Sequence, residues 1–279
     1  MSKTISYLGL AGSNSYIAAQ KYFKKYSLVS CNSFSSIVSK VIRGETNLGI
    51  LPLENSLTGS IYETYDLLLT GNLSIVGEIF LNINHHLLVK KIFLENKLDI
   101  LDLTHCYSHP EVFKQCKSFF HQYPHIKTIL TEDTTRAAIK LKEDKAIATC
   151  AIGTKLGASL YHLQTLKKNI AESPYNFTRF VVVSKKGQKK GNKVSLIFSV
   201  EHVPGSLLKT LEPYPRYGLN LTKIESRPVF GKPWEYIFFV DFELKDKKDL
   251  LPKILSQMKE HVNFLKILGL YEKGEIYES

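Results

Sequence analysis

Short apolar runs alternate with amphipathic stretches along the first 184 residues. The apolar runs have the length and the β-branched content of strands, and the stretches between them place apolar residues at helical spacing. This pattern predicts strands at 5–9, 47–53, 73–79, 86–93, 127–130 and 180–183, and helices at 13–26, 64–69, 111–120 and 134–141. Such alternation is typical of an α/β domain with parallel strand pairings.

A Lys- and Gly-rich stretch at 185–192 interrupts the pattern and predicts a linker between two domains. Downstream, strands are expected at 193–200, 219–225, 236–243 and 265–271, and helices at 204–211 and 248–261. Their order is βαββαβ, which is the ferredoxin-like arrangement. We therefore expect a first domain at 1–184, the linker, and a second domain at 193–279.

Composition narrows the class of protein. With 279 residues, 44% of them hydrophobic, the chain is long enough for two globular domains. No apolar run approaches the roughly 20 residues of a membrane span, and the N-terminus lacks a secretory pattern, so a cytoplasmic protein without a membrane partner is expected. The four cysteines show no CxxC spacing and are expected to be small buried side chains.

The net charge of +11 suggests nucleic-acid binding as one interpretation. Only five of the 37 basic residues are Arg, which leaves 32 Lys, and these are scattered among 26 acidic residues. Dispersed charge of this kind favours a protein without a nucleic-acid partner. Salt-dependent retention on a polyanion distinguishes the two interpretations.

The scarcity of Arg makes the tripeptide Thr178-Arg179-Phe180 informative, because it stands at the entrance of the predicted strand at 180–183. A guanidinium can hold a carboxylate by two parallel hydrogen bonds, and a neighbouring hydroxyl can donate a third or transfer a proton. The tripeptide therefore suggests an anionic small-molecule substrate. The alternative is a strand-edge ion pair between Arg179 and a nearby carboxylate, and this segment alone does not separate the two.

Two loops that follow predicted strands could complete such a site. The loop 9–15 leads into a helix, so backbone amides and hydroxyls collect at the helix N-terminus, although Ser13 could equally serve only as the helix cap. The segment Glu54-Asn55-Ser56 stands at the carboxyl end of a strand, where ligands bind in open α/β folds. The alternative there is a turn in which Asn55 and Ser56 bond their own backbone.

Histidine and cysteine crowd between residues 105 and 125. A metal site is disfavoured because no zinc spacing is present and because Pro124 separates His121 from His125. We expect neither a metal nor a cofactor. His85 and His86 could include a catalytic acid, although a structural role is expected for them.

Together these segments resemble the prephenate dehydratase family over nearly the whole chain. The motifs that carry the resemblance lie at 9–13 with 18–19, at 51–60, at 77–78 with His85, at 107–110 and at 176–180. The resemblance implies a two-lobed catalytic domain like that of periplasmic binding proteins, and a monofunctional enzyme, since no chorismate mutase segment precedes residue 4. The sequence departs from the family in the first loop, where Leu-Ala-Gly-Ser-Asn-Ser replaces Pro-Glu-Gly-Thr-Phe-Ser, and at Glu172, where Asp is common.

The reaction implied is loss of the ring carboxylate as carbon dioxide and of the 4-hydroxyl as water, which turns prephenate into phenylpyruvate in L-phenylalanine biosynthesis. The resemblance implies that Thr178 is the catalytic proton donor and that Arg179 clamps the retained pyruvyl carboxylate. The implied substrate site consists of Ser13, Glu54, Asn55, Ser56, Thr178, Arg179 and Phe180. Arogenate dehydratase and a non-catalytic amino-acid-sensing binding protein are the alternatives.

The C-terminal domain resembles an ACT regulatory domain. The motifs that carry this resemblance are Pro204-Gly205-Ser206-Leu207 and Glu225-Ser226-Arg227-Pro228. The resemblance implies that these eight residues bind L-phenylalanine as an allosteric effector, at an interface between the subunits of a homodimer or homotetramer. Small residues would let the ligand backbone approach closely, and Glu225 could meet its ammonium group.

Overall fold

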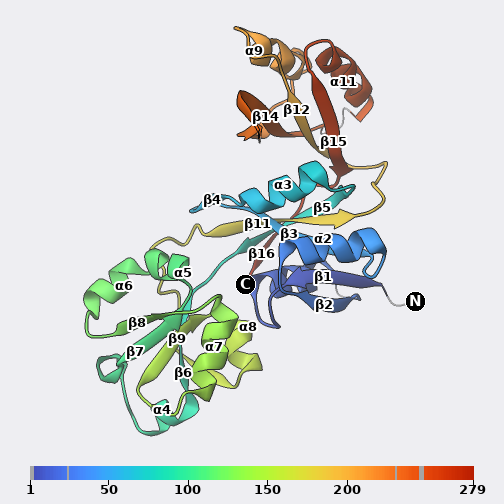
Figure 1. The fold of residues 1–279 in the computed structure, drawn as a ribbon. Helices are drawn as coiled ribbons and strands as arrows, with labels where there is room; N and C mark the ends of the chain where they lie inside the picture. Colours follow the sequence, from blue (N-terminus) through green and yellow to red (C-terminus); the bar gives the residue numbers. More distant parts are fainter. Residues whose placement is uncertain (1–2, 24, 230, 245–247) are drawn as a thin grey trace. The chain divides into compact units, whose positions relative to one another are not determined.

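The computed structural model describes residues 3–23, 25–229, 231–244 and 248–279. The chain divides into two compact units, whose helices and strands are labelled in Figure 1. The first holds Met1–Thr64, Ile79–Phe180 and Ile276–Ser279, and the second holds Tyr65–Glu78 and Val181–Glu275. These units differ from the predicted domains in three places, because residues 65–78 and 181–184 group with the second unit and the last four residues group with the first.

A seven-stranded sheet forms the framework of what we call the first lobe. Its strands run in the order β16-β5-β11-β3-β1-β2, and the short β4 pairs with β3. The parallel pairings of β1 with β2 and β3 agree with the predicted α/β class. The elements are β1 (Thr4–Leu8), α1 (Asn14–Tyr22), β2 (Ser27–Cys31), α2 (Phe34–Arg43), β3 (Leu48–Asn55), β4 (Gly59–Ser60), α3 (Tyr62–Thr70), β5 (Ser74–Asn82), β11 (Phe177–Ser184) and β16 (Ile276–Glu278).

A five-stranded sheet forms the second lobe, with the order β10-β6-β9-β7-β8. Strands β6, β7 and β9 are buried on both faces, whereas the edge strand β8 is mostly exposed. One face carries Leu87 and Val89 and packs on α4, α5 and α6, and the other carries Leu88 and packs on α7 and α8. The elements are β6 (His86–Lys90), α4 (Lys91–Glu95), η1 (Ile100–Asp102), β7 (His105–Ser108), α5 (Pro110–Gln115), α6 (Lys117–Gln122), β8 (Lys127–Leu130), α7 (Thr134–Glu143), β9 (Thr149–Gly153), α8 (Lys155–Leu160) and β10 (Leu163–Lys167).

Two crossing segments connect the lobes within the first unit, one at 83–85 and one at 168–176. They are hydrogen-bonded to each other, because Ile83 N donates to Asn176 O at 2.7 Å and Ile170 N donates to His85 O at 2.9 Å. Residues on the crossing segments therefore lie beside the ends of strands from both lobes.

The second unit contains a four-stranded antiparallel sheet in the order β13-β14-β12-β15. The element order along the chain is the predicted βαββαβ, with one extra helical turn after the first helix. Apolar side chains of β12 and β14 pack on α10 and α11 to form its core. The elements are β12 (Lys193–Ser199), α9 (Ser206–Leu211), α10 (Pro213–Arg216), β13 (Leu221–Val229), β14 (Lys232–Glu243), η2 (Lys248–Leu250), α11 (Leu251–Lys259) and β15 (Phe264–Tyr271).

Several predicted boundaries were wrong. The predicted helix at 13–26 ends at Tyr22, where Phe23 takes an extended conformation, and position 24 lies outside the described residues. The predicted strand at 86–93 ends at Lys90, because the chain turns into α4 to bury Phe93. The predicted helix at 111–120 is two helices that meet at Cys116. The prediction contained no β2, β7, β9, β10, β16, α2 or α8.

Candidate active site

Strands β3 and β11 lie side by side and bring Asn55 next to Thr178. The predicted strand at 180–183 in fact begins at Phe177, so Thr178 is a strand residue and not part of a preceding loop. Asn55, at the end of β3, donates from Nδ2 to Thr178 Oγ1 at 3.0 Å. The structure therefore brings together two of the predicted site residues from segments that are 123 positions apart.

The direction of this hydrogen bond is set by the backbone. Asn55 Oδ1 accepts from the amides of Leu57 at 2.9 Å and Thr58 at 3.0 Å. Backbone amides can only donate, so the side-chain oxygen of Asn55 must face them and its NH₂ group must face Thr178. The turn that the sequence left as an alternative is thus present for Asn55, whereas Ser56 bonds Tyr175 and Phe177 and not its own turn. The Asn55 turn leaves Thr178 Oγ1 as an acceptor, and among the described residues no acceptor engages the hydroxyl hydrogen.

The same NH₂ group begins a longer chain of contacts, which we call the polar network: Thr178, Asn55, Asn176, Gln115 and His85. Asn55 Nδ2 donates to Asn176 Oδ1 at 2.7 Å, and Asn176 Nδ2 donates to Gln115 Oε1 at 2.9 Å. His85 Nε2 lies 2.7 Å from the same Gln115 oxygen. His85 is 3% exposed, and burial lowers the pKa of its imidazole, so the ring is neutral at neutral pH.

Two predicted substrate ligands, Glu54 and Arg179, form an ion pair instead. Arg179 Nη1 lies 3.1 Å from Glu54 Oε1, and the arginine side chain is 3% exposed. Successive residues of a strand point to opposite faces of the sheet, so Arg179 and Glu54 lie on the face away from Thr178 and Asn55. The ion-pair alternative is therefore the observed one. The predicted clamp of Arg179 on a substrate carboxylate stays a prediction.

The two predicted serines use their hydroxyls within the protein. Ser13 caps α1, since its Oγ accepts from Tyr16 N at 3.2 Å and donates to Leu8 O at 3.2 Å. Ser56 donates to Tyr175 O at 2.7 Å and accepts from Phe177 N at 2.8 Å, which ties the end of β3 to the start of β11. Both side chains shape the site. Phe180 lies two residues after Thr178, so it is on the same face, where it is buried.

The loop after β1 is anchored on the second lobe. Thr154 Oγ1 donates to Gly12 O at 3.0 Å, and Tyr161 OH donates to Ala11 O at 2.8 Å. Gly12 has a φ of 95°, and a Cβ at this position would lie 3.1 Å from Gly157 Cα. Only glycine combines this positive φ with the absence of a Cβ, so only glycine fits here without strain. This close approach holds the loop that carries Ser13 in place.

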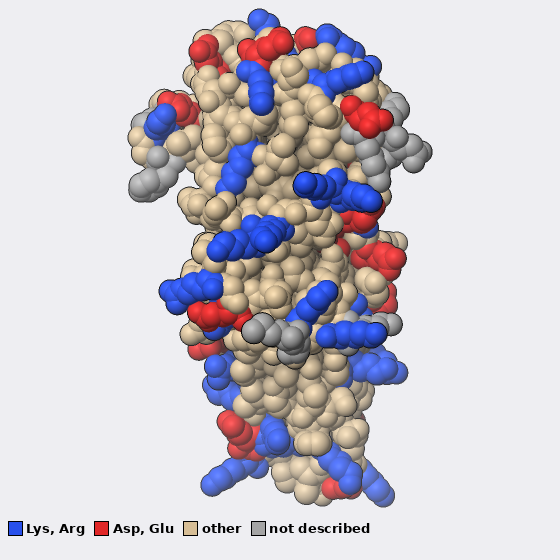
Figure 2. Space-filling model, turned by 90° about the vertical axis from the view of Figure 1, so that its right-hand side faces the viewer, with Lys and Arg blue, Asp and Glu red and all other residues tan. Residues whose placement is uncertain are grey.

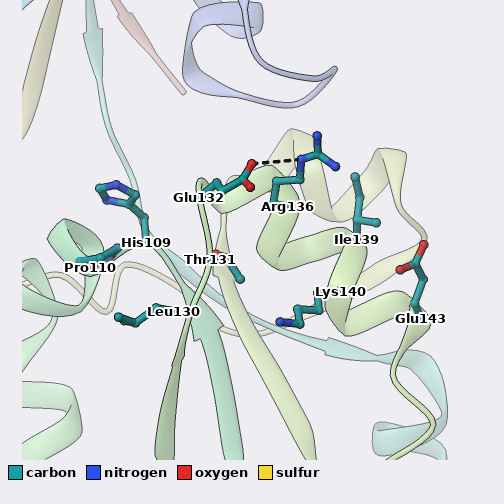
Figure 3. A pocket seen from close by; sticks show the side chains of 9 residues that line it. All are labelled: His109, Pro110, Leu130, Thr131, Glu132, Arg136, Ile139, Lys140 and Glu143. Carbon is teal, nitrogen blue, oxygen red and sulfur yellow. Dashed lines mark ion pairs between the residues drawn. The ribbon is translucent and has the colours of Figure 1, made fainter. Parts of the chain in front are cut away.

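Two cavities of the first unit lie outside the polar network. One, of about 750 Å³, lies on the second lobe beside β8 and α7, where Arg136 Nε and Glu132 Oε2 are 3.8 Å apart (Figure 3). The other, of about 580 Å³, has walls from both lobes, including Gly9 and Asp133. Neither lining contains Thr178 or Asn55. We place the candidate site at Thr178 and Asn55 because both stand in predicted motifs and the structure joins them by a hydrogen bond.

Metal and thiol chemistry receive no support from the part of the chain that the structure describes. Within it, no group of three His, Cys, Asp or Glu side chains could hold a metal ion. His109 caps α5, where its Nδ1 accepts from Glu111 N at 3.2 Å. All four cysteines are free and buried, which confirms the prediction from their spacing. Burial raises the pKa of the Cys116 thiol to about 12, so this thiol is a poor nucleophile.

Basic side chains are dispersed on the visible face of the molecule. Figure 2 shows Lys and Arg interleaved with Asp and Glu over that face, and no single basic patch dominates it. Among the described residues, no helix has the length and apolar character needed to cross a bilayer.

The two predicted effector motifs lie apart within the second unit. Pro204, Ser206 and Leu207 line a cavity of about 360 Å³, and Gly205 precedes α9 with a φ of 86°. The segment 225–228 lies on the edge strand β13, which β14 separates from β12. Arg227 Nη1 binds Asp66 Oδ1 of α3 at 3.0 Å. The predicted interface between subunits, which would join the two motifs, stays a prediction.

A family model described as prephenate dehydratase matches residues 5–188. The chain belongs to the prephenate dehydratase family. Prephenate dehydratases convert prephenate to phenylpyruvate with loss of carbon dioxide and water, and the chain is an enzyme of this class. The bifunctional chorismate mutase/prephenate dehydratase of Escherichia coli (strain K12) is 35% identical over 283 residues, which cover 99% of this chain and 72% of that protein.

Two solved structures share the fold of the prephenate dehydratase chain. The prephenate dehydratase of Arthrobacter aurescens in complex with L-Phe has a TM-score of 0.84 and 25% identity, over 96% of this chain and 90% of that one. GqqA, a quorum quenching acylase, has a TM-score of 0.85 and 26% identity, over 96% of this chain and 97% of that one. The acylase activity is a property of that protein.

The polar network shows which part of the candidate site could be found from sequence. Asn55 and Thr178 stand in motifs, and the structure joins them. Gln115 was missed because it is one polar residue on a predicted helix, and only the tertiary fold places it next to His85 and Asn176.

Proposed function

We propose that Thr178 assists the departure of the ring hydroxyl of prephenate in the decarboxylating dehydration to phenylpyruvate. The bond between the ring and its carboxylate breaks, and its electron pair moves into the ring as carbon dioxide leaves. The bond to the 4-hydroxyl breaks at the far end of the ring, and the departing oxygen takes up one proton to leave as water. Hydroxide is a poor leaving group, so a proton donor at this oxygen lowers the barrier.

The orientation of the Asn55 amide is the observation that carries this proposal. Because Asn55 Nδ2 donates to Thr178 Oγ1 at 3.0 Å, the threonine oxygen is already an acceptor, and its hydrogen is available to the substrate. A threonine hydroxyl is a weak acid, so it acts by holding and relaying a proton that solvent replaces. The Asn55 N–H stabilises the negative charge that develops on Oγ1 while the proton is transferred.

Phe180 and the polar network complete the proposed site. Phe180 is buried on the Thr178 side of β11, where an aromatic ring excludes water from the departing groups. Arg179 and Glu54 act from behind the sheet, since their ion pair at 3.1 Å joins β11 to β3 beside the Thr178 and Asn55 pair. In this proposal Arg179 holds the two strands in register and does not touch the substrate.

Thr178→Ser and Thr178→Val test the proposal, with phenylpyruvate formation from prephenate as the measurement. Serine keeps the hydroxyl, and valine replaces it with a methyl group of similar size. We expect turnover of Thr178→Ser within about tenfold of the parent, and a loss on the order of 100-fold or more for Thr178→Val. Equal turnover of the valine variant and the parent would remove Thr178 from the mechanism.

Arogenate is the necessary second substrate in this assay, because it differs from prephenate only by an amino group on the side chain. The enzyme is an arogenate dehydratase if kcat/KM for the release of phenylalanine from arogenate exceeds kcat/KM for the formation of phenylpyruvate from prephenate. Absence of turnover on both substrates, with retained binding, identifies the non-catalytic amino-acid-sensing protein.

The second unit is proposed to be an ACT domain that senses phenylalanine. Its ferredoxin-like strand order supports this, as does the cavity of about 360 Å³ lined by Pro204, Ser206 and Leu207. The Arthrobacter aurescens relative binds L-Phe. A homodimer or homotetramer would bring the segment 225–228 of one subunit to that cavity in another, since β14 separates the two motifs within one chain.

The regulatory proposal is tested by measuring turnover of prephenate at increasing phenylalanine concentrations. At each concentration, size-exclusion chromatography with light scattering gives the mass of the oligomer. We expect inhibition that saturates with phenylalanine and an oligomer at least as large as a dimer. Ser206→Trp, which fills the cavity, should abolish the inhibition and leave basal turnover intact. A monomer with phenylalanine-independent turnover contradicts the proposal.

A further inference from the structure

His85 is a buried titratable residue at the far end of the polar network from Thr178. It lies on the crossing segment 83–85 and contacts Gln115 of the second lobe at 2.7 Å. It does not contact Thr178, and the proposed function does not explain why a histidine occupies this position. Its contacts can be followed link by link, because the direction of each hydrogen bond depends on the one before it.

The first links run outward from the turn at 55–58. The Leu57 and Thr58 amides fix Asn55 Oδ1, so Asn55 Nδ2 donates to Asn176 Oδ1 at 2.7 Å. The oxygen of the Asn176 amide is therefore committed to Asn55, and its NH₂ group faces Gln115. Asn176 is 1% exposed, so a reversed amide would leave two NH₂ groups facing each other without water to separate them.

The last link determines the state of the histidine. Gln115 Oε1 accepts from Asn176 Nδ2 at 2.9 Å, so the group that faces His85 is an acceptor. His85 Nε2, at 2.7 Å from that oxygen, must therefore carry the proton. The Gln115 oxygen then uses both lone pairs, one for Asn176 and one for His85. The donors therefore converge on Gln115 Oε1, from Asn55 through Asn176 on one side and from His85 on the other.

We propose that His85 is a positioning residue for the dehydration, whose Nε2–H holds the Gln115 amide and, through Asn176, keeps the Asn55 NH₂ group on Thr178. This inference rests on the proposed function of Thr178. Without the histidine donor, Gln115 keeps only the Asn176 contact and is free to rotate away from it. Asn176 then loses its partner, and Asn55 is held at one end only.

The first test compares kcat and KM of His85→Phe and His85→Gln with those of the parent. Phenylalanine fills a similar volume without a donor, and glutamine can present an N–H where Nε2 stands. We expect His85→Phe to lower kcat about tenfold, the equivalent of one hydrogen bond, with KM changed by less than about threefold. His85→Gln should stay within about threefold of the parent in both constants.

His86→Phe is the matched control. His86 is the adjacent buried histidine, and its Nδ1 accepts from Asn169 N at 3.1 Å, outside the polar network. The same substitution there removes a hydrogen bond to the crossing segment at 168–176, from the residue that follows His85 in the chain. We expect a lower midpoint of thermal unfolding for His86→Phe and a kcat within about twofold of the parent.

A double-mutant cycle separates positioning from general damage to the fold. In a Thr178→Val background the hydroxyl that His85 positions is absent, so adding His85→Phe should lower kcat no further. A structural role predicts that the two losses multiply. Multiplied losses overturn the proposal, as does a kcat of His85→Phe within twofold of the parent.

A second pair keeps the test valid where His85→Phe does not fold. His85→Glu has the shape of His85→Gln, but its carboxylate can only accept. We expect a kcat loss in His85→Glu that shrinks as the pH falls and the carboxyl gains a proton to donate, whereas His85→Gln shows no such trend. Parallel pH profiles for the two variants overturn the proposal. Unchanged turnover in Thr178→Val would instead mark the failure of the proposed function.

Discussion

The exchange of Asn55 for aspartate tests the direction of the hydrogen bonding with the smallest change in shape. Asn55→Asp keeps an oxygen for the Leu57 and Thr58 amides and replaces the NH₂ group by a second oxygen. That oxygen then faces Asn176 Oδ1 across 2.7 Å and Thr178 Oγ1 across 3.0 Å. The first contact becomes repulsive. The second survives only if Thr178 turns its hydrogen from the substrate to the carboxylate.

Both effects have magnitudes that can be estimated. A buried acceptor left without a donor costs about 1–3 kcal/mol, so the free energy of unfolding should fall by that amount. Misdirection of the Thr178 hydrogen removes the proton donor, and such donors contribute on the order of 100-fold or more to the rate. We therefore expect kcat on prephenate to fall roughly 100-fold, which corresponds to about 2.7 kcal/mol in the activation barrier. The loss should diminish as the pH falls through the pKa of the introduced carboxyl.

The measurement is phenylpyruvate formation at saturating prephenate across a range of pH, with urea unfolding of each variant. Asn47→Asp is the matched control, because its side-chain oxygen accepts from Thr4 N at 2.8 Å and aspartate keeps that contact. We expect the control to stay within about twofold of the parent in kcat. A kcat for Asn55→Asp as high as that of the control would refute the direction assigned to the network.

Three further predictions concern stability. Lys193→Met should lower the free energy of unfolding in urea by about 3–5 kcal/mol, because Lys193 Nζ lies 2.8 Å from Glu78 Oε1 and the Glu78 side chain is 0% exposed. A loss below about 1 kcal/mol would contradict this prediction. The double variant Lys193→Met with Glu78→Leu should recover most of the lost stability. Gly12→Ala should lower the free energy of unfolding by about 1–3 kcal/mol more than Gly44→Ala. Both glycines have a positive φ, but of the two only Gly12 would place a Cβ within 4 Å of a neighbour, Gly157 Cα. Equal losses of stability in urea unfolding would count against the close approach of Gly12 to Gly157. Burial lowers the pKa of His85 in the native state, so the unfolded chain takes up the proton first and stability is lost as the pH falls through about 6.5. His85→Gln should reduce the dependence of the unfolding free energy on pH, measured by urea titrations at a series of pH values. An unchanged dependence would refute the neutral, buried state of His85.

The second unit shows what apolar patterning predicts well. Each bound of its four long strands lies within four residues of the predicted one, and the largest differences are the end of β13 and the start of β14, where the predicted strands were four residues too short. Long strands with one face on a core carry a clear alternation, so their number and order follow from the sequence. The same reasoning missed β9, which has five buried residues and no alternation, and β2, whose Ser27-Leu28-Val29-Ser30-Cys31 contains only two aliphatic side chains.

The return of the chain end to the first sheet could not be read from local pattern. Strand β16 has three residues and pairs in parallel with β5, through Ile276 beside Phe80. A three-residue strand carries too little periodicity to be predicted, and its pairing depends on an edge of β5 that exists only after the sheet has formed. The unit boundary at Glu275 therefore follows from tertiary structure.

Local geometry shows the ion pair that the sequence offered as one interpretation of Arg179, and it shows that the two interpretations of Asn55 are compatible. For Arg179, strand alternation directs its side chain to the face opposite to that of Thr178, where it pairs with Glu54. For Asn55, the turn and the contact with Thr178 use different atoms of one amide. The turn accepts two backbone amides through Oδ1, and this acceptance is what commits Nδ2 to Thr178. A turn residue therefore sets the direction of the hydrogen bond on which the proposed chemistry depends, and a serine or glycine that merely kept the turn would lose that direction.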